Sequence, residues 1–149
     1  MFDPLSVNGD PPALVGLPCE ELLVSEYWHK GELVEPANVI YLRFGGRWHR
    51  LYFDWAIVFW RPHDVAPEAV PQGEDDFAYP LVDVGRRFGV RGVLLDGLMA
   101  APIYGGSEVR FEFRNGMVLV FSSVADTTTY SARPGAAADG GGMSAFPES

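Results

Sequence analysis

Apolar and charged side chains alternate most clearly in the last third of the chain. Residues 109–113 read Val-Arg-Phe-Glu-Phe, and this period of two is typical of a strand with one buried face. Asn115-Gly116 follows, a pair that favours a tight type I′ turn because both turn positions need a positive φ. The apolar run 117–121 then follows as a second strand. The pattern predicts a hairpin.

A two-residue turn would fix which side chains of this hairpin share a face. Two apolar pairs would lie on the buried side: Phe113 with Val118, and Phe111 with Val120. Arg110 and Glu112 would lie on the other side.

A similar pattern occurs about seventy residues earlier, where Gly45-Gly46 separates residues 39–44 from residues 47–53. The predicted pairs on one side are Ile40 with Leu51 and Leu42 with His49. Those on the other side are Tyr41 with Arg50 and Arg43 with Trp48. Two hairpins of like design arise by internal duplication or as separate hairpins of two sheets, and we favour the second interpretation.

The remaining segments predict further short strands. Apolar runs at 56–60, 81–84 and 91–98 are bounded by turn residues, and 85–89 is expected to form a single helical turn. Residues 62–76 hold three prolines and five acidic side chains, which predicts a long solvated loop.

Residues 18–31 satisfy two opposite patterns. Pro18 followed by two glutamates, with Lys30-Gly31 at the end, matches the start and stop signals of a helix. The runs Leu22-Leu23-Val24 and Tyr27-Trp28 favour a strand instead. We interpret the segment as a strand because the rest of the chain is rich in strands that would pair with it.

Together these elements predict a mainly β fold, an antiparallel β-sandwich or curled half-barrel of seven to nine strands with at most one or two short helices. A chain of 149 residues suffices for one hydrophobic core. We therefore expect a single β domain over 1–130, beginning with an irregular arm at 1–12. A flexible tail is expected at 131–149, where Gly, Ala, Ser and Pro dominate.

The charge balance argues against nucleic acid as a partner. Eleven basic residues against twenty acidic ones give a net charge of −9, which repels phosphate backbones and would attract a basic protein. No run of about 20 apolar residues predicts a membrane span. The single cysteine and the absence of a secretory signal favour a cytoplasmic location. Arginine greatly outnumbers lysine, which indicates a GC-rich bacterial genome.

Motifs for metal, cofactor or nucleotide binding are absent from the sequence. One cysteine and three isolated histidines, His29, His49 and His63, do not make a zinc pattern, and no glycine-rich phosphate loop occurs. We therefore predict no metal and no cofactor. His49 is the best single catalytic candidate because the predicted register places it beside Leu42 on the core side. A hydrogen-bonded structural histidine is the commoner explanation.

Aromatic residues are unusually dense between positions 41 and 60. The first hairpin places five side chains on one face, which we call the arginine-aromatic face: Tyr41, Arg43, Trp48, Arg50 and Tyr52. One interpretation is a second buried layer with arginine stems reaching outward. The other is an exposed recognition surface, since Tyr, Trp and Arg dominate binding hot spots.

From these observations we expect a non-enzymatic interaction module of a bacterial cytoplasm that uses this face for binding, with a protein partner or a homo-oligomer expected and a small-molecule ligand possible. An acidic inhibitor or immunity-type protein is one specific form. Two alternatives stay open. One is a small-molecule-binding barrel or small enzyme with its site near His49. The other is a structural subunit that forms homodimers through edge strands.

Overall fold

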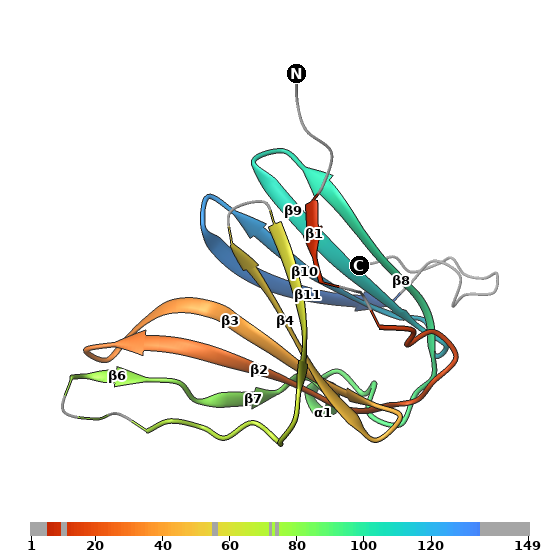
Figure 1. Cartoon of the computed structure of the whole chain (residues 1–149), viewed down its shortest axis with the longest axis horizontal. Helices are drawn as coiled ribbons and strands as arrows, with labels where there is room; N and C mark the ends of the chain where they lie inside the picture. Colours follow the sequence, from red (N-terminus) through yellow and green to blue (C-terminus); the bar gives the residue numbers. More distant parts are fainter. Residues whose placement is uncertain (1–5, 10–11, 55–56, 72, 74, 135–149) are drawn as a thin grey trace.

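The computed structural model describes residues 6–9, 12–54, 57–71, 73 and 75–134. Two β-sheets and one short helix make up this part of the chain, and neither sheet closes into a barrel within the described residues. Figure 1 shows the two sheets packed against each other. The predicted mainly β fold is confirmed.

The larger sheet has seven strands in the order β1-β5-β4-β3-β2-β6, with β7 also paired to β2. Its strands are β1 (Ser6–Asn8), β2 (Cys19–His29), β3 (Glu32–Phe44), β4 (Arg47–Asp54), β5 (Ile57–His63), β6 (Phe77–Ala78) and β7 (Leu81–Asp83). All pairings are antiparallel except that of β1 with β5, which makes the sheet mixed.

The smaller sheet has four antiparallel strands in the order β11-β10-β9-β8. They are β8 (Leu95–Ile103), β9 (Gly106–Phe113), β10 (Met117–Val124) and β11 (Thr127–Pro134). The described residues thus hold eleven strands rather than the expected seven to nine. Strand β7 lies within the predicted run 81–84. The strands that were not predicted are β1 and β6, which are too short to give a periodic signal in the sequence, and β11.

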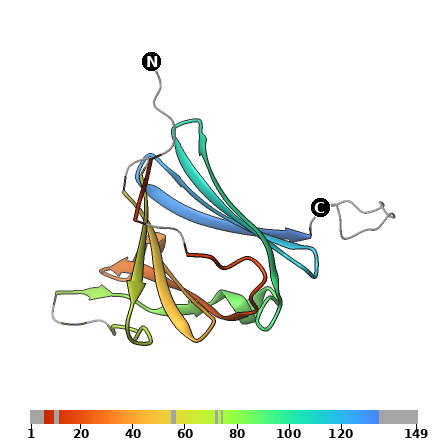
Figure 2. The same ribbon diagram turned by 45° about the vertical axis from the view of Figure 1, so that its right-hand side comes forward.

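One core lies between the sheets, with buried apolar side chains from both. The largest fully buried side chains include Leu42, Leu51, Phe111 and Phe121. Residues 12–18 run between the sheets at one edge (Figure 2). Backbone hydrogen bonds hold this segment, since the N–H of Gly16 donates to the Leu95 carbonyl at 2.8 Å and the N–H of Leu95 donates to the Leu17 carbonyl at 3.0 Å.

The hairpin between β3 and β4 has the predicted register in full, and all four predicted pairs are present. Gly45 and Gly46 both adopt positive φ, at 60° and 76°, as a two-residue type I′ turn requires. Ile40, Leu42 and Leu51 are fully buried on one side. The alternation of the sequence therefore gave the correct faces.

The hairpin between β9 and β10 forms where it was predicted, but its predicted register was wrong by one residue. Val118 pairs with Glu112 and Leu119 with Phe111. The reason is a three-residue turn in which Gly116 alone has a positive φ, 92°, and its N–H donates to the Phe113 carbonyl at 2.9 Å.

Tertiary contacts explain this longer turn. The Asn115 side-chain amide donates to the Gly89 carbonyl at 3.1 Å, and its Oδ1 accepts from the Met117 N–H at 3.0 Å. Both bonds use the side chain of Asn115. Its backbone does not take the left-handed conformation that a type I′ turn would need.

Residues 18–31 form the long strand β2, so the strand interpretation was correct. Lys30 and Gly31, read as a helix end, instead form the turn to β3 with φ of 53° and 78°. The predicted helical turn is present as α1 (Val84–Arg87), where the Asp83 side chain accepts from the Arg86 N–H at 2.9 Å. The two glycine hairpins lie in different sheets, as the favoured interpretation expects.

Three predicted boundaries differ from the structure. The strand expected at 91–98 begins only at Leu95, because residues 91–92 form a turn. Within the expected irregular arm, Ser6–Asn8 pair with β5. Strand β11 continues to Pro134, four residues into the expected tail. Residues 131–134 are ordered because they pair with β10. Residues 135–149 of that tail lie outside the described residues.

Candidate binding face

The five residues of the arginine-aromatic face lie together on the side of the larger sheet opposite the core. Tyr41 pairs with Arg50 and Arg43 with Trp48 across β3 and β4, while the core residues alternate with them. Each of the five is half-buried. The face is therefore neither a fully buried second layer nor fully open to solvent.

Strand β5 adds three side chains to this face that the sequence interpretation missed: Phe59, Arg61 and His63. Phe59 pairs with Tyr52, and their rings stack with centroids 4.9 Å apart and planes 1° from parallel. The Tyr41 and His63 rings lie 5.0 Å apart. Alternation along β5 is the signal that would have placed them, since Trp60 between them is buried.

Arg50 differs from Arg43 of the same face in having no carboxylate nearby, although the Nε of each is buried without a hydrogen-bond partner in the described residues. The guanidinium of Arg50 lies 5.7 Å from the centroid of the Tyr52 ring. Its Nε is buried and, in the part of the chain that the structure describes, has no hydrogen-bond partner. None of the ion pairs found among these residues includes Arg50.

The neighbouring arginines are engaged elsewhere. Arg43 forms ion pairs with Glu20 at 3.3 Å and with Glu21 at 3.8 Å. Arg61 donates to the Asn8 backbone carbonyl at 2.9 Å and also to the Asn8 side chain, and so ties β1 to β5. Neither Arg50 nor Arg61 has a carboxylate partner among the described residues, but Arg61 is held by Asn8. Arg50 is thus the arginine of this face for which neither an ion pair nor a side-chain hydrogen bond is found there.

Charge is unevenly distributed along the chain. Residues 39–63, which include the last six residues of β3 and all of β4 and β5, hold four arginines and a single acidic residue, Asp54. The whole chain has a net charge of −9. The middle of the larger sheet is therefore a locally basic region in an acidic protein. Burial raises the pKa of the Tyr41 phenol, and the nearby Arg50 charge partly opposes this shift.

His49 lies on the other side of the sheet, toward the core, paired with Leu42 and Pro62. Burial lowers the pKa of its imidazole, and the Arg47 charge lowers it further. No ion pair between His49 and a carboxylate is found in the described residues. The histidine and carboxylate pair expected of a general base is therefore not assembled there.

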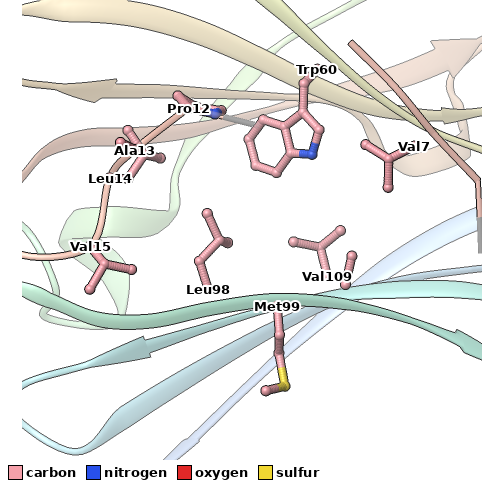
Figure 3. A pocket seen from close by; sticks show the side chains of 10 residues that line it. Val7, Pro12, Ala13, Leu14, Val15, Trp60, Leu98, Met99 and Val109 are labelled. Carbon is pink, nitrogen blue, oxygen red and sulfur yellow. The ribbon is translucent and has the colours of Figure 1, made fainter. Parts of the chain in front are cut away.

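A cavity of about 310 Å³ lies between the two sheets (Figure 3), and His49 is not among the residues that line it. Apolar residues line it: Val7, Pro12, Ala13, Leu14, Val15, Trp60, Leu98, Met99, Ala100 and Val109. Neither a histidine nor a carboxylate is among them, so the cavity does not provide the mixed pocket that acid–base catalysis needs. No local pattern in the sequence predicts this cavity, because its walls come from both sheets.

The described residues contain no group of three or more His, Cys, Asp or Glu side chains placed to hold a metal ion. Burial, together with nearby carboxylates, raises the pKa of the Cys19 thiol to about 12. This thiol therefore stays protonated and is a poor nucleophile at neutral pH. Within the described part of the chain, no helix is long and apolar enough to span a membrane.

Comparisons with protein families, with curated proteins and with solved structures found no match for this chain. The proposals below therefore rest on its own residues and their geometry.

Proposed function

We propose that this chain is a non-enzymatic interaction module of a bacterial cytoplasm that binds an acidic protein partner through the arginine-aromatic face. The observation that carries the proposal is Arg50, a half-buried guanidinium beside Tyr52 with no carboxylate partner among the described residues. A carboxylate of a partner would supply the missing counter-charge.

The chemistry of the face suits such a partner. A guanidinium presents several donors in a planar fork, which matches a carboxylate in a two-bond arrangement. Trp48, Tyr41 and Tyr52 surround Arg50 with large apolar area, and Trp, Tyr and Arg supply most binding hot spots. The local excess of arginine at 39–63 supports an acidic contact surface rather than a basic one.

The geometry also limits what binding would cost in conformational entropy. The Tyr52 ring is stacked on Phe59, and the Tyr41 ring contacts His63. Side chains that are already ordered lose less freedom when a partner covers them. A preordered face of this kind supports a role in recognition.

The test begins with a photoreactive benzophenone amino acid in place of Tyr52, which cross-links the bound protein in the host cell. The partner is then purified, and its Kd is measured for the unmodified chain and for Arg50→Gln. We expect Arg50→Gln to weaken binding at least tenfold, because truncating one side of a buried charge pair typically costs about 2–5 kcal/mol. Its melting temperature should stay within a few degrees of the parent.

Arg110→Gln is the matched control. Arg110 also lies on an outer sheet face and has a buried Nε without a partner, but Glu108 and Glu112 flank it at 3.7 and 3.9 Å. We expect this variant to bind normally. Equal Kd values for Arg50→Gln and the parent, or equal losses in both variants, would contradict the proposal.

A second candidate is the acidic inhibitor, in which the surface outside 39–63 captures a basic protein. The net charge of −9 supports it, because charge of one sign raises the rate of association with an opposite surface. An association rate that falls steeply with salt and is unchanged in Arg50→Gln would favour this candidate. Homodimer formation through edge strands stays a prediction, which sedimentation of the chain alone tests.

A further inference from the structure

Among the described residues that line the cavity between the sheets, Trp60 is the one whose side chain carries an N–H or O–H group. The Trp60 side chain extends from β5 toward Leu98 and Val109 of the smaller sheet, with its indole nitrogen on the side facing Val7 and Val109 (Figure 3). Trp60 is only 3% exposed. Of the side-chain hydrogen bonds found in the described residues, none is donated by its indole N–H.

This N–H opens onto the cavity and has no acceptor among the described residues, so a ligand that places an acceptor there would gain a hydrogen bond. The other lining side chains are apolar, so an apolar ligand that displaces water from them would gain from the hydrophobic effect. None of the described lining residues has a charged side chain, so an ionised ligand would lose its hydration without gaining a counter-charge from them.

Size narrows the class further. The cavity measures about 310 Å³, and an apolar protein cavity of roughly 150 Å³ holds one benzene ring. A volume of this order suits a molecule of one or two rings, or a short branched chain.

We propose that this cavity is a binding site for a small, neutral, apolar molecule whose one hydrogen-bond acceptor, such as a ketone or ester carbonyl, accepts from the Trp60 indole N–H. The site lies on the inner side of the larger sheet, so it is separate from the arginine-aromatic face. The proposal does not depend on the proposed function.

The test uses two probes of almost equal shape, acetophenone and α-methylstyrene, in which a C=CH₂ group replaces the C=O. Each is titrated into the ¹⁵N-labelled full chain, and the indole N–H resonances are followed by NMR. Trp60→Phe identifies the Trp60 resonance by its loss. We expect acetophenone to bind about threefold to tenfold more tightly, as one net hydrogen bond contributes. The Trp60 N–H resonance should move downfield only with the ketone.

Two variants make the result specific. In Trp60→Phe the preference for the ketone should fall to about one, while α-methylstyrene still binds. In Leu98→Phe, which fills the cavity and keeps the indole, both probes should bind at least tenfold more weakly. Thermal melting checks that each variant is folded. If Trp60→Phe does not fold, the loss of binding in Leu98→Phe tests whether the probes occupy this cavity.

Three results would overturn the proposal. They are the failure of both probes to bind saturably, a preference for the ketone that persists in Trp60→Phe, and binding of benzoate as tight as that of acetophenone. The last would show that the site does not discriminate against charge.

Discussion

At the scale of single residues, burial decides what the ionisable groups can do. Cys19 is fully buried and Glu35 partly so. Loss of hydration raises the pKa of both groups. For Glu35 the rise is partly offset, because the Thr128 N–H donates to its carboxylate at 3.0 Å. His49 responds in the opposite direction, because burial disfavours the charged imidazole. Burial therefore favours the neutral form of His49, the catalytic candidate predicted from the sequence, on the core side of β4.

His49 should therefore make folding sensitive to mild acid. Its pKa in the folded chain lies below the ordinary value of about 6.5, so the neutral form contributes stability that is present above that pH. The contribution is lost as the pH falls below it. We expect His49→Gln to lose less melting temperature than the parent between pH 7.5 and pH 5, measured by circular dichroism. An equal fall in melting temperature in the two proteins would show that protonation of His49 does not destabilise the folded chain.

At the scale of elements, backbone conformation explains which predictions from the sequence succeeded. Gly45-Gly46 adopts positive φ at both positions without strain, so the local sequence determined the turn and the whole register of β3 and β4. Asn115 failed as a predictor because its side chain bonds to Gly89, 26 residues away. No local pattern reveals a contact of that range.

Gly106, at the start of β9, offers a test of how closely the strands of the smaller sheet approach. A Cβ at this position would lie 1.7 Å from the Ser123 carbonyl oxygen of β10, a backbone atom that cannot move without breaking the pairing. We expect Gly106→Ala to lower the free energy of unfolding by at least about 2 kcal/mol, measured by urea denaturation.

Gly73→Ala is the control for this substitution, since nothing lies within 4 Å of a Cβ there and its φ is not positive. It should change the free energy of unfolding by no more than about 0.5 kcal/mol. If Gly106→Ala and Gly73→Ala unfold at the same urea concentration, β9 and β10 do not approach each other as closely at Gly106 as the structure shows.

At the scale of the whole molecule, the sequence predicted one half of the candidate site and not the other. Alternation along β3 and β4 was enough to place Tyr41, Trp48 and Arg50 on one face. The side chains of β5 were missed because the interpretation followed only the hairpin. The cavity could not be predicted at all, since Trp60 and Val109 meet only when the two sheets pack.

The two proposed sites lie on opposite sides of the larger sheet. The larger sheet has its core and cavity on one side and the arginine-aromatic face on the other, with a local excess of positive charge in an acidic chain. The proposed binding role requires that this second side is a surface, held in order by ring contacts, rather than a second core.

Urea unfolding of two variants of the same strand tests that claim most directly. Leu51 is fully buried in the core, and Trp48 is half-buried on the opposite side of β4. Leu51→Ala should lower the free energy of unfolding by about 2–5 kcal/mol, as is usual for a buried leucine. We predict that Trp48→Ala costs less than half as much. An equal or larger cost for Trp48→Ala would mean that the arginine-aromatic face is a second packed layer, and the proposed binding role would fall with it.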